Sequence, residues 1–196
     1  MNLEGLTVGF AVTGSFCTLK SVMPEVAKLV KRGVTVIPIM SENAQTIDTR
    51  FGKAADFINE LETITQHKII HNIDTAEPIG PKKLLDALII APCTGNTLSK
   101  IAGGITDTCV TMATKAHLRN QGPLILGIAT NDGLGLNAKN IGVIVSTKNI
   151  YMVPFRQDDP YKKQNSIVSK MDLIIPTLEQ GLAGKQYQPM VLGSNE

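Results

Sequence analysis

The sequence predicts a single-domain α/β fold, an open parallel sheet with helices on both faces. Short apolar segments rich in β-branched residues alternate along the chain with segments whose apolar residues recur at helical spacing. The connections between these segments are short, and no linker, internal repeat or low-complexity stretch divides the 196 residues. Such alternation is typical of right-handed βαβ units, which build parallel sheets.

The N-terminal part of the chain predicts a strand, a helix and a second strand. Residues 6–12 are short and apolar, and the turn Thr13-Gly14-Ser15 follows them. The next apolar residues recur as on one face of a helix: Leu19, Val22, Met23, Val26, Leu29 and Val30. Gly33 ends this helix as a C-terminal glycine does. Residues 34–40 form the second strand, and Pro38, which has no N–H to donate, ends it or places it at an edge.

The middle of the chain predicts a second amphipathic helix and a buried strand. Apolar positions at helical spacing mark the helix: Phe57, Ile58, Leu61 and Ile64. Residues 68–73 are a short strand candidate, and residues 74–81 are a loop because of their proline and glycine content. Residues 84–91 are apolar apart from Asp86, and a continuous apolar strand is usually buried on both faces.

The last third repeats the alternation. Its elements are, in order, a polar turn at residues 94–97, helical segments that include residues 108–119, a strand at 124–128, a turn at 131–133, a helix at 137–147, a strand at 150–153 and an amphipathic helix at 166–182. Residues 1–183 form the predicted domain. We expect the extended, apolar tail 184–196 to be either a frayed end or an arm that docks on a neighbouring subunit of an oligomer.

Composition and charge exclude several classes of function. The 19 Lys and Arg residues nearly balance the 17 Asp and Glu residues, and no run of basic residues exceeds two, so neither nucleic acid nor a membrane surface is an expected partner. Every apolar stretch is shorter than the roughly 18 residues of a membrane span, and we expect a soluble, unexported, cytoplasmic protein. Cys17, Cys93 and Cys109 form neither a CxxC pair nor an even set, which disfavours disulfides and a metal site.

Small polar residues follow successive predicted strands. They are Thr13, Gly14 and Ser15 after the first strand, Ser41 after the second, Thr94, Gly95, Asn96 and Thr97 after the strand at 84–91, and Thr130 and Asn131 after the strand at 124–128. Ligands of open α/β sheets bind beyond the carboxyl ends of the strands. Helix N-termini with Ser and Thr hydroxyls bind phosphate without lysine, so the pattern predicts a phosphorylated cofactor. Each residue taken singly is more simply an N-cap, and only their accumulation favours a ligand.

Motifs of other common sites are absent. The first turn lacks the GxGxxG spacing, no GxxxxGK[ST] occurs, and no G-x-S-x-G surrounds a serine. ATP, a dinucleotide bound in the usual way and a hydrolase triad are therefore disfavoured.

Residues 91–107 resemble the A-P-x-T-A-N-T-x-x-K-x-A-x-G-x-x-D segment of the homo-oligomeric flavin-containing cysteine decarboxylase family, which includes flavin prenyltransferases. Residues 12–15 and 40–41 are similar to the first two phosphate-side loops of that family, and the likeness runs from about residue 6 to residue 155. The resemblance implies a Rossmann-like flavoprotein fold, FMN as the cofactor and a homo-oligomer. On this interpretation Gly14 and Ser15 hold the phosphate, Ser41, Thr94, Asn96 and Thr97 complete its cradle, and Thr130 and Asn131 lie near the flavin ring or the substrate.

A second set of segments resembles a narrower branch of that family, the B chains of two-chain oxidoreductases that make pyridine-2,6-dicarboxylate in sporulating bacteria. The segments are residues 43–46, 50–52, 76–81, 129–137, 148–151 and 184–186. This resemblance implies an A chain as partner, NADP or NAD bound on that A chain, and a small dicarboxylate with a dihydropyridine ring as substrate.

The chain departs from the decarboxylases at two places. Residues 77–80 lack the catalytic histidine of that family, and residues 129–132 read A-T-N-D where the family has a P-A-M-N type segment. The departures favour oxidation over decarboxylation or flavin prenyl transfer, and they assign no catalytic acid or base. A flavin-independent scaffold that organises the A chain stays open as an alternative. Arg50, Lys100 and Lys115 are candidate cations for the substrate carboxylates.

Overall fold

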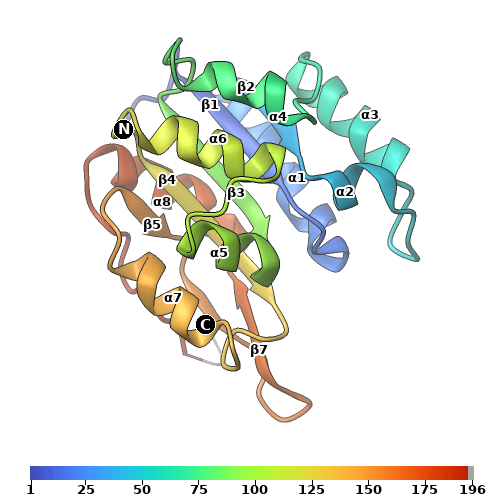
Figure 1. Ribbon diagram of the computed structural model, residues 1–196, viewed down its shortest axis with the longest axis vertical. Helices are drawn as coiled ribbons and strands as arrows, with labels where there is room; N and C mark the ends of the chain where they lie inside the picture. Colours follow the sequence, from blue (N-terminus) through green and yellow to red (C-terminus); the bar gives the residue numbers. More distant parts are fainter. Residues whose placement is uncertain (194–196) are drawn as a thin grey trace.

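The computed structural model describes residues 1–193 and has a seven-stranded sheet at its centre (Figure 1). The strands are β1 (Thr7–Val12), β2 (Thr35–Met40), β3 (Ala87–Cys93), β4 (Leu124–Thr130), β5 (Ile150–Met152), β6 (Phe155–Asp159) and β7 (Lys163–Ser169). Their order is β2-β1-β3-β4-β7-β6, with β5 paired to β4 beside this path. The pairs among β1 to β5 are parallel, whereas β7 is antiparallel to both β4 and β6.

Helices cover both faces of this sheet, which confirms the predicted α/β class. They are α1 (Phe16–Lys31), α2 (Glu42–Thr46), α3 (Ala54–Thr65), α4 (Ile73–Ala76), α5 (Gly95–Ala102), α6 (Cys109–Leu118), α7 (Ala138–Val145) and α8 (Ile174–Leu182), with the short 3-10 helices η1 (Glu77–Ile79) and η2 (Met171–Leu173). Figure 1 shows α5, α6 and α7 in front of the sheet. The opposite core contains side chains of α1, α3 and α8.

The two cores are separate because side chains alternate between the faces of a strand. In β3, Ile89 packs with the core that contains α1 and α8, while Leu88 and Ile90 pack with the core that contains α5 and α6. All of β3 is buried, as its apolar sequence predicts, although the strand begins at Ala87 instead of residue 84. Asp86 precedes the strand, and its carboxylate accepts a hydrogen bond from the Thr7 N–H at 2.8 Å.

Proline and glycine act in the first βαβ unit as predicted. β2, which contains Pro38, is at the edge of the sheet, where an absent N–H costs least. Gly33 follows the C-cap of α1 with φ of +78°, the left-handed conformation that glycine adopts without strain.

The prediction of one helix over residues 166–182 is wrong in its first part. Residues 163–169 form β7, and the helix α8 begins only at Ile174. Ile167 pairs with Thr130 of β4, so a contact between distant segments overrides the local helical spacing. The β6–β7 hairpin was not predicted, because its sequence is mostly polar and lacks the alternation of a half-buried strand.

Two predictions for residues 68–81 also need correction. Instead of a strand at 68–73, Ile70 alone forms an isolated bridge with Ile39, and α4 begins at Ile73. The proposed loop at 74–81 is largely helical, with α4 followed by η1, and it buries Ala76 and Ile79. A capping box at Asn72 stabilises the start of α4. The buried side chains of Ala76 and Ile79 anchor the two short helices to the core.

The described part of the tail, residues 184–193, lies against its own domain. The Gln186 side chain exchanges hydrogen bonds with the backbone of Met152, and Val191 forms an isolated bridge with Phe155. A role for the tail as an arm between subunits stays a prediction, and residues 194–196 of it lie outside the described residues. Within residues 1–193, no helix is both long enough and apolar enough to cross a membrane.

Candidate functional site

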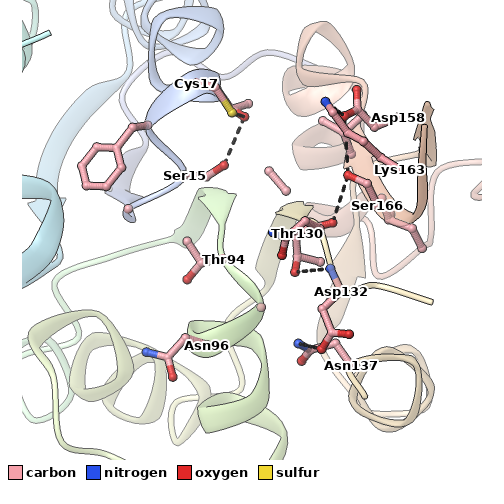
Figure 2. A pocket seen from close by; sticks show the side chains of 18 of the residues that line it. Ser15, Cys17, Thr94, Asn96, Thr130, Asp132, Asn137, Asp158, Lys163 and Ser166 are labelled. Carbon is pink, nitrogen blue, oxygen red and sulfur yellow. Dashed lines mark hydrogen bonds and ion pairs between the residues drawn. The ribbon is translucent and has the colours of Figure 1, made fainter. Parts of the chain in front are cut away.

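A cavity of about 1020 Å³ opens where β1, β3 and β4 end, and the first turns of α1 and α5 form part of its wall. Figure 2 shows side chains from four parts of the chain around it. The residues that line it are Gly14, Ser15, Phe16, Cys17, Thr18, Ser21, Phe51, Thr94, Gly95, Asn96, Ala129, Thr130, Asn131, Asp132, Asn137, Asp158, Lys163, Ser166, Ile167 and Val168.

Hydrogen bonds from Thr13 join the ends of β1 and β3 beneath the cavity. The buried Thr13 hydroxyl donates to the Pro92 carbonyl oxygen at 2.7 Å and accepts from the Thr94 N–H at 2.9 Å. These contacts fix the Gly14-Ser15 turn beside the start of α5. Thr13 therefore positions the site without lining it.

The start of α1 forms one wall, and its chemistry suits an anion. Ser15 is the N-cap, yet its side chain makes no capping hydrogen bond, and its Oγ lies 3.2 Å from the hydroxyl of Thr18. The first turn contains no acidic residue. The N–H groups and the partial positive charge of this helix start therefore face the cavity with no carboxylate from the same turn beside them.

The start of α5 forms the second wall. Thr94 caps this helix by accepting a hydrogen bond from the Thr97 N–H at 3.3 Å. A Cβ atom at Gly95 would lie 2.6 Å from both Asn137 Nδ2 and Thr130 Oγ1, so only glycine lets these polar groups approach the backbone. Asn96 follows and also lines the cavity.

The loop after β4 forms the third wall, and the carboxylate of Asp132 accepts hydrogen bonds from within this loop. Asp132 accepts hydrogen bonds from the Leu136 N–H at 3.2 Å and from Asn137 Nδ2 at 3.3 Å. The Asp132 N–H donates to Thr130 Oγ1 at 3.2 Å. The Asp132 carboxylate therefore stabilises the loop, and its two oxygens each already have a donor.

The β6–β7 hairpin forms the fourth wall with Asp158, Lys163 and Ser166. The Lys163 Nζ lies 2.6 Å from Asp158 Oδ2, and this hydrogen-bonded ion pair raises the pKa of Lys163 above its ordinary value. Sequence reasoning missed all three residues, because nothing local in a polar hairpin reveals a pairing with β4. The cavity residues Cys17, Thr18 and Ser21 had a usable signal, since they lie in the first turns of the helix after β1.

The cavity brings together most of the residues that the sequence predicted for a cofactor. Those in the lining are Gly14, Ser15, Thr94, Gly95, Asn96, Thr130 and Asn131. Thr97 is buried behind Thr94. Ser41 caps the start of α2, and its N–H donates to the Val12 carbonyl oxygen at 3.0 Å, so it lies near the end of β1 but outside the lining. Cofactor binding by these residues stays a prediction.

The three cationic residues that we considered as partners of the substrate carboxylates, Arg50, Lys100 and Lys115, lie outside the lining of this cavity. Lys100 forms an ion pair with Asp107 at 2.8 Å, and that bond lowers the pKa of Asp107. The guanidinium of Arg50 stacks 4.9 Å from the ring centroid of Phe51, which itself lines the cavity.

A second cavity of about 730 Å³ has an acidic lining that includes Glu42, Asp74, Glu77 and Asp107. Such a lining repels phosphates and carboxylates, so the first cavity is the better candidate for an anionic ligand. No group of three or more metal-ligating side chains occurs among the residues that the structure describes.

Comparison with known proteins agrees with this fold. The model of the Flavoprotein family matches residues 1–175, and the chain belongs to that family. The B subunit of dipicolinate synthase from Bacillus subtilis strain 168 is 47% identical over 191 residues, which are 97% of this chain and 96% of that protein.

Solved structures give the same relationship. The crystal structure of the dipicolinate synthase B subunit from Bacillus halodurans C has a TM-score of 0.91 and 47% identity, covering 98% of this chain and 99% of that chain. The FMN-dependent cysteine decarboxylase SpaF has a TM-score of 0.66 at 20% identity, covering 91% of this chain and 98% of that chain, and it shows the shared fold alone.

Proposed function

We propose that this chain acts as the B subunit of a dipicolinate synthase, in the oxidation of dihydrodipicolinate to dipicolinate during sporulation, and that it binds FMN in the cavity. The observation that carries the proposal is the 47% identity to the Bacillus subtilis protein over 97% of the chain. An A chain that binds NADP or NAD would be its partner, in the cytoplasm of a sporulating cell, and the active form would be an oligomer.

The residues of the cavity fit FMN. The N-terminus of α1 with Ser15, and the N-terminus of α5 with Thr94, offer backbone N–H groups and hydroxyls to a phosphate. Apolar side chains in the lining could pack against a flavin ring: Phe16, Phe51, Ala129, Ile167 and Val168. The cavity volume of about 1020 Å³ leaves room for a substrate beside the cofactor, because ligand pockets usually measure about 300–1,000 Å³.

The chemistry assigned to the chain itself is binding and orientation. Oxidation of a dihydropyridine ring removes a hydride equivalent and a proton, and a bound flavin can accept the hydride equivalent. Thr130 and Asn131 lie at the end of β4, where they could orient a ring by hydrogen bonds. The ion pair of Asp158 and Lys163 lines the same cavity from the hairpin.

The direct test is reconstitution of the reaction. Dihydrodipicolinate oxidation is measured with this chain, with an A chain and with both together, each with and without FMN, and with NADP or NAD present throughout as the electron acceptor. We expect full activity only with both chains and FMN. Full activity of both chains without any flavin would leave this chain the role of a scaffold that organises the A chain, and activity of the A chain alone at the same rate would refute the proposal.

A substitution at the start of α1 tests the phosphate site. Ser15→Asp keeps a good N-cap for α1, so the fold should persist, but its carboxylate would repel a phosphate. We expect the Kd for FMN to rise about a hundredfold, since two charges about 4 Å apart near a protein surface repel by a few kcal/mol. Riboflavin, which has no phosphate, should bind both proteins equally in a fluorescence titration. Equal loss of FMN and riboflavin would contradict a phosphate contact at Ser15.

A further inference from the structure

Lys163 is the one cationic side chain among the described residues that line the cavity. It is the first residue of β7, and β7 reaches the cavity because its end pairs with β4 at Ala129 and Thr130. The pairing therefore places a positive charge in the same cavity as the starts of α1 and α5.

The Lys163 ammonium is held in place by a chain of polar contacts. Its Nζ lies 2.6 Å from Asp158 Oδ2, and the Ser166 hydroxyl lies 3.5 Å from the same oxygen and 3.4 Å from the Thr130 carbonyl oxygen. This chain joins the hairpin to the end of β4, as Figure 2 shows. An ammonium has three N–H donors, so the bond to Asp158 leaves others that can point to a ligand.

The other carboxylate of the cavity does not compete for this ammonium. Both oxygens of Asp132 accept hydrogen bonds from its own loop, from the Leu136 N–H and Asn137 Nδ2. Asp158 is the carboxylate that Lys163 contacts, and its side chain is 36% exposed, so water competes for that bond. A carboxylate of a ligand can therefore share the ammonium with Asp158.

We propose that Lys163 binds one carboxylate of the dicarboxylate substrate and so determines specificity for an anionic ring. The proposal rests on the proposed function, since that function supplies the dicarboxylate. Asp158 acts as a positioning residue that orients the ammonium. In the proposed function the starts of α1 and α5 serve the cofactor phosphate, so Lys163 is the cavity cation left for a carboxylate of the substrate.

Lys163 contributes to ground-state and transition-state binding alike, because the carboxylates do not change charge when the ring is oxidised. Its loss should therefore raise KM and leave kcat nearly unchanged. The Lys163 side chain is 58% exposed, so we expect a modest effect, an increase of about tenfold in KM and in the Kd for dipicolinate. The affinity of the natural chain should also fall as salt concentration rises.

The experiment compares Lys163→Met, Lys163→Arg and the matched control Lys162→Met. Lys162 is the neighbouring lysine of the same hairpin, it is exposed and it lies outside the cavity lining. Each FMN-loaded protein is titrated with dipicolinate and with its neutral diamide. The readout is the rate at which a maleimide modifies Cys17, which lines the cavity and is exposed, whereas Cys93 and Cys109 are buried. KM and kcat are measured with the A chain present.

The expected result is a weaker affinity of Lys163→Met for dipicolinate alone, with unchanged affinity for the diamide and near-natural behaviour of Lys163→Arg and Lys162→Met. If the natural chain turns over the substrate and Lys163→Met has an unchanged Kd and KM, the proposed role of Lys163 is wrong. An equal loss of dipicolinate affinity in Lys162→Met would mean that the effect comes from the overall charge of the hairpin. That result would also overturn the proposal. If the natural chain neither binds dipicolinate nor supports its formation, the proposed function itself fails.

Discussion

At the scale of single residues, the polar groups at the strand ends divide into two roles. Thr13 and Thr97 are buried and hold the backbone of the site together. Ser15 and Asn96 face the cavity from the starts of two helices. One sequence pattern therefore contained both structural and ligand-facing residues, since the backbone geometry at a strand end needs hydrogen bonds whether or not a ligand binds.

The buried histidine gives a prediction on pH. His117 is 1% exposed, its Nε2 lies 3.1 Å from the Pro123 carbonyl oxygen, and burial lowers its pKa below the ordinary 6.5. Below pH 6.5 the unfolded chain therefore binds a proton that the folded chain does not bind. The free energy of unfolding should fall as pH is lowered from 7 to 5.5, by at most about 1.4 kcal/mol for each pH unit below 6.5.

Urea unfolding at pH 7 and pH 5.5 measures this dependence. In His117→Gln, which cannot titrate, the difference in stability between the two pH values should shrink, although the variant is less stable at both. His71→Gln is the matched control, because it removes a histidine that is exposed instead of buried. A pH dependence in His117→Gln as steep as in the natural chain would show that other groups cause it.

At the scale of elements, the β6–β7 hairpin decides the chemistry of the site more than any helix does. It adds an antiparallel pair to an otherwise parallel sheet, and it supplies Asp158, Lys163 and Ser166 to the cavity. In Figure 1 the tip of the hairpin extends beyond the body of the sheet, and residues 161–165 are exposed. Its polar sequence suits that position, because only the end near β4 is buried.

Two glycines with open space around them give opposite predictions for alanine. At both Gly142 and Gly104, a Cβ atom would have no neighbour within 4 Å. Gly142 lies inside α7, so Gly142→Ala should stabilise the protein by about 1 kcal/mol, the difference in helix propensity. Gly104 has φ of +67°, so Gly104→Ala should destabilise the protein by about 1 kcal/mol.

Chemical denaturation of the two variants measures both changes. Replacing glycine by alanine reduces the conformational entropy of the unfolded chain by the same amount in both variants. Opposite signs of the two changes in the free energy of unfolding would therefore come from the backbone conformation of each residue in the folded protein. Destabilisation by Gly142→Ala would contradict the argument from helix propensity.

At the scale of the whole molecule, binding of FMN should stabilise the fold. The cavity is lined from the starts of α1 and α5, the loop after β4 and the hairpin, and a ligand in it would link these segments. A free FMN concentration of about 100 times Kd should raise the free energy of unfolding by about 2.7 kcal/mol. Thermal unfolding with increasing FMN checks this, and Ser15→Asp is the matched control with little shift. Absence of any shift in the natural chain would contradict FMN binding.

The sequence by itself determined the class of fold and the edge of the sheet where the cavity lies. Alternating apolar segments predicted β1 to β5, α1, α3, α6 and α7, because hydrophobic periodicity is a local property of the chain. The same sequence placed polar residues after successive strands, and parallel strands bring those ends together.

Only the tertiary structure decided which of these residues face the cavity and which charged side chain joins them there. The short helices α4 and η1 and the change from helix to strand at residues 163–169 depend on contacts with distant segments. Lys163 enters the site only because Ile167 pairs with Thr130, more than thirty positions earlier in the chain. Local propensity carries no information about such a pairing, which forms because it closes the open edge of β4 and buries Ile167.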